Sequence, residues 1–540
     1  MGVAVPDVIQ GTVRRPLEVG RTLFDYADAV SSAVPQSCRR TGRCRECVVE
    51  VRQGLISLSP RTSAEAYLRG GFRLACQAEI EATSEDVEFA IIRRRMRILE
   101  STEAPATRLD PVVTADELAV RYNGQPIDLR RNHVLGLAID IGTTTVVFRI
   151  IDLLTGTVVA GGALENPQRF GGSDVMSRIS YEKDFPGAMR LAVRRALNHE
   201  LRDIYRAMGI DRHEVYEAII VANSTMRDLF FGIDIAPIGE FPYKSSTEVA
   251  MLAGRTDSTW LRRRGHEVGL LMNPHGRVVG APVIASHVGG DTAADLVAVD
   301  FAGGEGIRML IDIGTNTEVV VTDGTRFLAA SCPAGPAFEG GLLRFGMPGA
   351  DGAIESVRLE GEGFAFATIG DVDPVGICGS GLVDVLAELR RARWMNEEGR
   401  FRDSLDEFLI APDQGITFSR SDASLLAQAK AANACGQRIL LRRLGVTADQ
   451  VERVYLAGGF ANAVDVVNAI EIGLLAPVPA ERVMRVGNAA LHGAAGLLLS
   501  KSRRDVLDSL IGRIEHVELE TEEDFFELFV DGCRFVPIAA

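Results

Sequence analysis

The sequence has 540 residues, more than one hydrophobic core usually serves, so we expect two or three domains. Its net charge of −15 argues against non-specific binding to nucleic acid, which favours a basic surface. No apolar run is long enough to cross a membrane, and the N-terminal residues do not have the pattern of a signal peptide. We therefore expect a cytoplasmic protein that binds neither nucleic acid nor membrane.

Residues 1–90 are predicted to form a small domain of short strands around one helix. A turn separates two strand-like runs within 9–19, residues 21–30 have the pattern of an amphipathic helix, and 47–54 return to strand. The order of hairpin, helix, cysteine-containing loop and strand suits a β-grasp domain. Residues 91–133 are less regular, and we interpret them as the end of a last strand followed by a linker.

Four of the eight cysteines lie before residue 80: Cys38, Cys44, Cys47 and Cys76, with the spacing C-x5-C-x2-C-x28-C. Four thiolates, three from one loop and one from a distant segment, are what a 2Fe–2S cluster requires. The alternative is a structural zinc site, which usually takes its cysteines as two C-x2-C pairs. The spacing found here is similar to that of adrenodoxin-type ferredoxins and favours the cluster.

The same loop carries Arg39, Arg40, Arg43 and Arg45. Positive charge near a cluster makes its reduction easier and attracts an acidic electron-transfer partner. Exposed arginines without a functional role are the alternative interpretation.

From residue 134 the pattern changes to alternating buried strands and helices, which is typical of an α/β architecture. It contains an internal repeat, because GLAIDIGTTTVVF at 136–148 and MLIDIGTNTEVVV at 309–321 share D-I-G-T-x-T-x-V. We therefore expect two similar lobes, over 134–300 and 301–540.

Each copy of the repeat predicts a phosphate-binding turn between two strands. Glycine lets the backbone approach phosphate, and the next residues offer hydroxyl, amide and main-chain donors; the residues concerned are Gly142, Thr143, Thr144, Gly314, Thr315 and Asn316. Asp140 and Asp312 would repel phosphate and are better suited to holding hydrated Mg²⁺. Asp291, at the start of a predicted helix, either assists Mg²⁺ or the attacking water, or caps that helix.

With LAGGFAN at 456–462, these turns resemble the actin-like ATPase superfamily, a two-lobed ASKHA fold related to ribonuclease H. The resemblance implies that 140–145 and 312–317 are the two phosphate motifs. It also implies that Gly458 and Gly459 form the adenosine motif, where the nucleotide lies against bare backbone.

The full set of motifs indicates a narrower family within this superfamily. The four cysteines are followed by both turns, SCPAGPAFEGG at 331–341, GICGSGLVD at 376–384, LAGGFAN and GNAALHGAAG at 487–496. Together they resemble the reductive activators of corrinoid proteins over almost the whole chain. The resemblance implies ATP-dependent, one-electron reduction of a corrinoid methyl carrier from Co(II) to Co(I) through a 2Fe–2S cluster. It implies as partners the corrinoid protein of a methyltransferase system and a low-potential electron donor; a homodimer is compatible with it.

Three other hypotheses remain open at this stage. One is an ATP-dependent activator of a radical dehydratase or reductase, although such activators hold a 4Fe–4S cluster at a dimer interface. Another is a redox-regulated small-molecule kinase. The third is a non-enzymatic redox carrier, against which the intact Asp140 and Asp312 argue.

Overall fold

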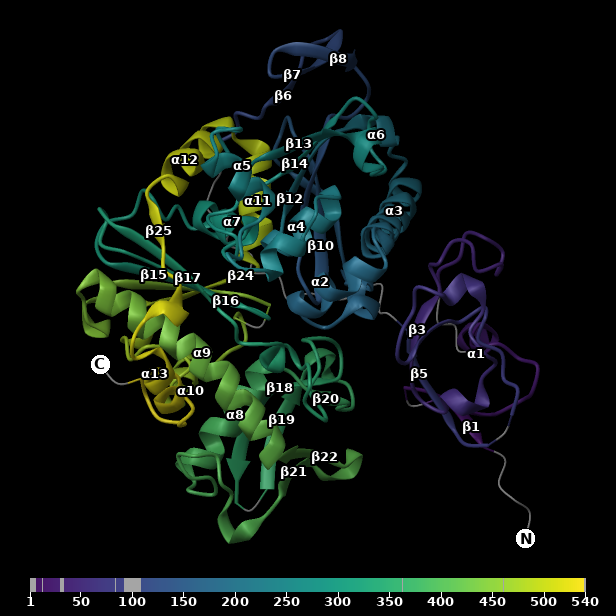
Figure 1. Cartoon of the computed structure of the whole chain (residues 1–540), viewed down its shortest axis with the longest axis vertical. Helices are drawn as coiled ribbons and strands as arrows, with labels where there is room; N and C mark the ends of the chain where they lie inside the picture. Colours follow the sequence, from purple (N-terminus) through teal and green to yellow (C-terminus); the bar gives the residue numbers. More distant parts are fainter. Residues whose placement is uncertain are drawn as a thin grey trace.

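The computed structural model describes residues 6–11, 13–29, 34–82, 84–91, 108–361, 363–459 and 461–538. Figure 1 shows a small N-terminal domain beside a larger body made of two lobes, one above the other. We refer to these parts as the ferredoxin-like domain, lobe I and lobe II. No helix among the described residues is long and apolar enough to span a membrane.

The ferredoxin-like domain is a five-stranded sheet in the order β2-β1-β5-β3-β4, packed against helix α1 (Leu23–Ala29). Its strands are β1 (Asp7–Gln10), β2 (Val13–Pro16), β3 (Val48–Gln53), β4 (Phe72–Leu74) and β5 (Val87–Ile91). Strands β1 and β5 are parallel, and the other pairs are antiparallel. The predicted hairpin, helix and return strand are all present in this order.

The range 91–133, expected to be a linker, contains a three-stranded antiparallel sheet. It is formed by β6 (Val113–Ala115), β7 (Ala119–Tyr122) and β8 (Gln125–Leu129). Asn123 and Gly124 join the last two strands with φ angles of +50° and +81°, as a tight hairpin turn requires. The polar composition of the segment concealed this Asn-Gly hairpin signal; the arginine-rich residues 92–100 lie outside the described residues.

Lobe I is built on a six-stranded mixed sheet in the order β11-β10-β9-β12-β14-β13. Its strands are β9 (Leu135–Ile141), β10 (Thr145–Asp152), β11 (Val158–Glu165), β12 (Val215–Val221), β13 (Leu261–Arg264) and β14 (Arg277–Gly280). Its helices are α2 (Val175–Asp184), α3 (Ala188–Met208), α4 (Ser224–Phe231), α5 (Ser246–Leu252), α6 (Gly265–Val268) and α7 (Gly290–Ala298), with the 3₁₀ helix η3 at Pro167–Gly171.

Lobe II repeats this plan with a sheet in the order β24-β23-β15-β16-β17-β25. Its strands are β15 (Arg308–Ile313), β16 (Thr317–Thr322), β17 (Phe327–Cys332), β23 (Arg453–Ala457), β24 (Val483–Gly487) and β25 (Ile514–His516). Two small sheets are added, from β18 (Ala353–Glu360), β19 (Gly363–Thr368) and β20 (Gly376–Ile377), and from β21 (Glu407–Ala411) and β22 (Ile416–Ser419). The helices are α8 (Gly379–Arg391), α9 (Arg420–Leu444), α10 (Val466–Glu471) and α13 (Phe525–Gly532).

Helices α11 (Ala489–Leu499) and α12 (Lys501–Ile511) belong to lobe I, although they lie within the range 301–540 assigned to lobe II from the sequence. Figure 1 shows both yellow helices beside α7. Small residues allow α11 and α7 to pack closely: a Cβ on Gly493 would lie 1.9 Å from the carbonyl oxygen of Ala294. The chain therefore crosses between the lobes again before it ends.

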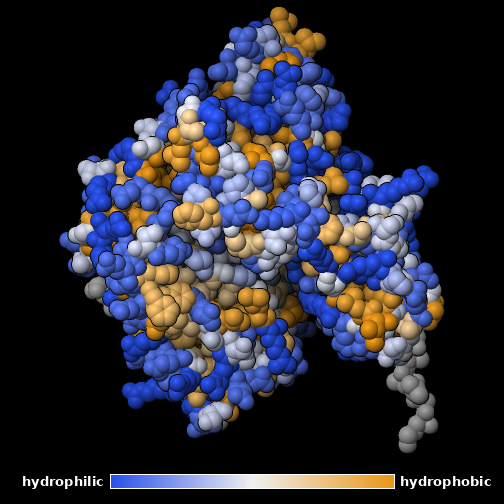
Figure 2. All heavy atoms as spheres, viewed as in Figure 1, coloured by the Kyte–Doolittle hydropathy of each residue, from blue (hydrophilic) through white to orange (hydrophobic). Residues whose placement is uncertain are grey.

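The repeated hairpins β9–β10 and β15–β16 occupy equivalent places in the two sheets, each next to a parallel strand. Both first strands are almost fully buried, and both hairpin turns point to the space between the lobes. In space-filling representation, a notch on the visible face separates the ferredoxin-like domain from lobe II, whereas the domain adjoins lobe I (Figure 2).

Candidate functional site

A cavity of about 210 Å³ lies between the lobes and is lined from both of them. All eleven residues that the sequence suggested for nucleotide and Mg²⁺ line it: Asp140, Gly142, Thr143, Thr144, Asp291, Asp312, Gly314, Thr315, Asn316, Gly458 and Gly459. The fold thus brings four separate segments of the chain to one place.

The two turns are closed by short backbone hydrogen bonds. The amide of Gly142 donates to the carbonyl of Thr145 at 2.9 Å, and the amide of Gly314 donates to that of Asn316 at 3.1 Å. A Cβ on Gly142 would lie 2.8 Å from the Thr145 carbonyl oxygen, so this turn requires glycine.

The two glycines after β23 have different structural roles. Gly458 has a φ of +115°, and a Cβ there would lie 2.2 Å from the carbonyl oxygen of Ile313, so this glycine is needed for the contact between adjacent strand ends. A Cβ on Gly459 would meet nothing within 4 Å. Gly459 therefore leaves bare backbone facing open space, as a surface for a flat adenine ring would need.

Three carboxyl groups from different elements converge in the cavity. Burial raises the pKa of Asp140 to about 8 and that of Asp312 to about 7, and in both cases the nearby Asp291 carboxylate adds to the shift. Burial also raises the pKa of Asp291 to about 6. A cation bound among these carboxyl groups would favour their ionised forms, so the arrangement suits Mg²⁺.

The sequence analysis missed three further acidic residues in this cavity: Asp295, Glu318 and Glu339. Burial raises the pKa of each of them. Neither oxygen of Asp295 accepts a hydrogen bond from a donor among the described residues. Its interaction with Asp312 therefore needs a proton shared between the two carboxyl groups.

Two of these residues had a signal in the sequence. Asp295 follows Asp291 by four residues on α7, and this spacing places both on one helix face. Glu318 is the charged residue of the second repeat where the first has Val146. Glu339 lies in the motif quoted at 331–341, but no role was predicted for it from the sequence, because it reaches the site through the fold. The Thr144 and Thr315 hydroxyls both donate to its carboxylate.

Amide side chains hold the first turn and its aspartate. The Nδ2 atom of Asn488 donates to Asp140 Oδ2 at 3.0 Å, and that of Asn223 donates to Thr143 Oγ1 at 3.2 Å. Asn488 caps helix α11, so the returning helix supplies a direct contact with the predicted Mg²⁺ residue.

In the ferredoxin-like domain the four predicted cysteines lie in two pairs. The Cys47 and Cys76 sulfurs are 3.4 Å apart, and the Cys38 and Cys44 side chains are hydrogen-bonded to each other. The hydrogen bond between Cys47 and Cys76 lowers the pKa of the Cys76 thiol and raises that of Cys47. No three or more His, Cys, Asp or Glu side chains are assembled as ligands of one ion among the described residues.

The loop around these thiols is tightly wound. Gly42 has a φ of +75°, and a Cβ there would lie 2.9 Å from that of Ala64. The Gly42 amide and the Gln77 side chain both hydrogen-bond the Cys76 sulfur, the latter at 3.4 Å. Donors aimed at sulfur are what a negatively charged cluster requires.

Two of the loop arginines have contacts within the domain. Arg40 forms ion pairs with Asp25, at 2.6 Å, and with Asp28. Arg45 lies over the Tyr67 ring, 4.5 Å from its centroid. The remaining cysteines, Cys332, Cys378, Cys435 and Cys533, lie in lobe II, and the first three are buried.

Family comparisons match nearly the whole chain. Residues 8–81 match a 2Fe–2S iron–sulfur cluster binding domain, residues 135–303 match the RACo middle region, and residues 306–538 match the C-terminal ASKHA domain of RACo. The two lobes are thus matched by the middle and C-terminal regions of RACo, and the ASKHA-type fold predicted from the motifs is confirmed.

Individual relatives agree with this assignment. The corrinoid activation enzyme RamQ of Eubacterium limosum is 30% identical over 437 residues, covering 76% of this chain and 72% of RamQ. A Methanosarcina barkeri reductase of a Co(II) methylated-amine-specific corrinoid protein is 24% identical, covering 73% of this chain and 76% of the reductase. A solved reductive activator for a corrinoid iron–sulfur protein superposes with a TM-score of 0.72 and 26% identity, over 99% of both chains.

Proposed function

Because this chain belongs to the family of reductive activators of corrinoid proteins, we propose that it returns an inactivated Co(II) corrinoid protein to Co(I), with ATP as the energy source. The observation that carries the proposal is the joining, in one chain, of a four-cysteine loop to a two-lobed cavity lined by paired phosphate turns.

The four thiols of Cys38, Cys44, Cys47 and Cys76 would hold a 2Fe–2S cluster. Their two pairs match two irons, and the Gly42 amide and the Gln77 side chain would stabilise its negative charge. A bound cluster of this type carries one electron at a time, which is the number needed to convert Co(II) into Co(I).

In the cavity, the Gly142–Thr144 and Gly314–Asn316 turns would bind the phosphates of ATP, and Gly458 and Gly459 would lie against its adenosine. Asp140 and Asp312, assisted by Asp291, would hold Mg²⁺ and its waters. A cation there relieves the crowding of buried carboxylates, whose pKa values are raised by burial and mutual repulsion.

Energy from ATP is required because Co(I) is reached only at a potential below that of ordinary ferredoxin-type clusters, which lie near roughly −400 mV. Each 59 mV of shortfall corresponds to about 1.4 kcal/mol for one electron. Closure of the two lobes on the nucleotide would favour one conformation of the bound corrinoid protein and couple the two sites.

The test follows the absorbance of a Co(II) corrinoid protein with a low-potential donor, with and without ATP. We expect reduction only when both the cluster and ATP are present, and we expect the corrinoid protein to stimulate ATP hydrolysis. Equal rate and extent of reduction without nucleotide would refute the activator and favour a simple redox carrier.

A further inference from the structure

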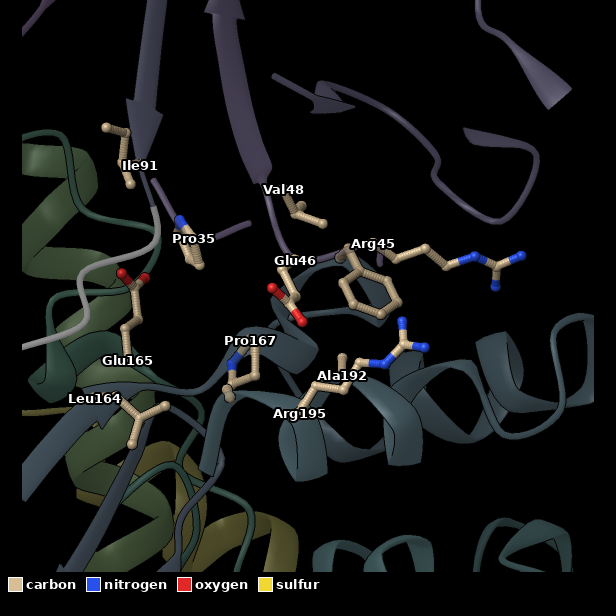
Figure 3. Close-up of a pocket in the computed structure, with 12 residues that line it drawn as sticks. Pro35, Arg45, Glu46, Val48, Ile91, Leu164, Glu165, Pro167, Ala192 and Arg195 are labelled. Atoms are coloured by element: carbon tan, nitrogen blue, oxygen red, sulfur yellow. The ribbon is translucent and has the colours of Figure 1, made fainter. Parts of the chain in front are cut away.

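The ferredoxin-like domain meets lobe I at the cysteine loop itself. Arg195, on helix α3 of lobe I, donates a hydrogen bond from Nη1 to the backbone carbonyl of Cys44. Figure 3 shows the Arg195 side chain rising from α3 toward the segment that carries Arg45 and Glu46. Arg195 and Glu46 line the same small cavity, of about 20 Å³, so the two surfaces meet closely around them.

Other contacts hold this interface in place. The hydroxyl of Tyr181, on α2, donates to the backbone carbonyl of Tyr67, and the Phe170 ring packs edge-on against both tyrosines with centroid distances of 5.5 Å. At the periphery, Arg69 pairs with Asp184 at 2.5 Å. The ferredoxin-like domain is therefore held against lobe I by an interface of aromatic and polar contacts.

We propose that Arg195 is a positioning residue that sets the reduction potential of the cluster from across the domain interface, with Glu46 opposing it. The inference rests on the proposed cluster at the four cysteines. A guanidinium group keeps its charge at every relevant pH, and one-electron reduction adds one negative charge to the cluster. A cation hydrogen-bonded to a ligand's own backbone stabilises the reduced form and raises the potential.

The same elements also contact the first phosphate turn. Arg178, one helical turn before Tyr181 on α2, donates to the carbonyl of Thr143 at 2.6 Å. The Asn166 side chain, next to η3, donates to the carbonyl of Gly142 at 2.7 Å, and its backbone amide donates to that of Thr144 at the same distance. Both Arg178 and Asn166 are fully buried.

Helix α2 and η3 thus have one end on the phosphate turn and the other on the ferredoxin-like domain. A nucleotide that moves this turn would shift Tyr181 and Phe170, and with them the surface on which the domain docks. When the domain leaves α3, the cluster loses its Arg195 neighbour and becomes a stronger reductant. Nucleotide control of this interface is the second half of the proposal.

The test is an EPR-monitored redox titration of the full-length iron–sulfur protein. We expect Arg195→Gln to lower the midpoint potential of the cluster and Glu46→Gln to raise it, each by about 59 mV. A shift of this size changes the ratio of reduced to oxidised cluster at a fixed potential roughly tenfold. Arg206→Gln is the matched control, since Arg206 is an exposed arginine on α3 roughly 16 Å further along the helix. The cluster of the Arg206→Gln variant should have the same midpoint potential as that of the parent protein.

Arg195→Lys separates charge from folding, because it keeps the cation and should restore most of the parent potential. An unchanged midpoint potential in Arg195→Gln, with normal iron and sulfide content, would overturn the role of Arg195. A potential lowered equally by Arg195→Lys and Arg195→Gln would overturn it too, because loss of packing would then explain the effect.

The second half is tested by repeating the titration with Mg²⁺ and a non-hydrolysable ATP analogue. We expect the parent potential to fall on nucleotide binding and the Arg195→Gln potential to stay constant; a parent potential unaffected by bound nucleotide refutes nucleotide control. The outcomes are distinct from failure of the proposed function. If the purified protein holds no cluster, the proposed function is wrong. If the midpoint potential depends on nucleotide but no cobalt is reduced, the proposed function fails and the inference about Arg195 still holds.

Discussion

The hydroxyl of Thr144 in lobe I donates a hydrogen bond of 3.2 Å to the carboxylate of Glu339 in lobe II, and the Thr315 hydroxyl donates to the same oxygen. One carboxylate therefore ties both predicted phosphate turns together. These two hydroxyls are the donors that a nucleotide phosphate would use, so Glu339 and phosphate compete for them.

Replacing this competitor should tighten ATP binding. Glu339→Gln keeps the shape of the side chain and removes its negative charge, and we expect the Kd for ATP to fall roughly fivefold, a gain of about 1 kcal/mol. Isothermal titration calorimetry measures the change, with the exposed Glu360→Gln as control. Weaker ATP binding in Glu339→Gln would instead mean that the Glu339 carboxylate contributes to the ATP-bound state, for example by orienting a water molecule.

Asp140 and Asp312 should matter more for turnover than for affinity. Each carboxylate orients hydrated Mg²⁺ in our proposal, so Asp140→Asn or Asp312→Asn should lower the ATPase kcat by about tenfold to hundredfold and change the Kd for ATP by less than roughly threefold. Steady-state ATPase assays and calorimetry provide the two numbers. Unchanged turnover in Asp312→Asn would show that the Mg²⁺ site is misplaced.

Local motifs were readable from the sequence because their chemistry is set by spacing along the chain. The cysteine loop, both glycine turns and Gly458–Gly459 are each contiguous or nearly so, and the repeat gave the two lobes. Contacts made through tertiary structure were not readable in this way, even for residues that lie within the quoted motifs at 331–341 and 487–496. Asn488 lies 348 positions from its partner Asp140, and Glu339 lies 195 from Thr144.

The same reason explains the lobe boundary. Nothing local in 487–496 says that α11 returns to lobe I; its small residues fit against α7 only once both lobes exist. The interface between the ferredoxin-like domain and lobe I was equally hidden, because Arg195 and Cys44 are 151 positions apart. Short motifs predict which chemistry a site can perform, whereas tertiary packing determines which other residues contact that site.

The eight cysteines should divide cleanly into two groups. Replacing Cys38, Cys44, Cys47 or Cys76 by serine should remove or damage the cluster, because each would be an iron ligand. Replacing Cys332, Cys378, Cys435 or Cys533 should leave about two irons and two sulfides per chain, since these thiols lie in lobe II. Iron and acid-labile sulfide analysis with visible spectra measures both groups. One bound zinc in a colourless protein would contradict the assignment.

The buried carboxyl groups predict how stability varies with pH. Asp140 and Asp312 have an ordinary pKa of 3.8, raised to about 8 and about 7 in the folded protein. Between these limits the folded state binds more protons than the unfolded state, so stability falls as pH rises, and the loss should be evident between pH 6 and pH 8. Mg²⁺ favours the ionised carboxylates and should flatten this dependence.

Asp295 adds to the effect, because burial raises its pKa well above the ordinary value and both its oxygens lack donors among the described residues. Asp295→Asn supplies an amide that can donate to Asp312 without a shared proton, and it removes one ionisable carboxyl group from the cavity. We expect the Tm of the lobes at pH 8 to rise by about 2–4 °C, with a smaller change at pH 6. Differential scanning calorimetry at the two pH values, with the exposed Asp505→Asn as control, measures this. A parent-like pH dependence in Asp295→Asn would mean that Asp295 is not electrostatically linked to Asp312 and that the raised pKa values have another origin.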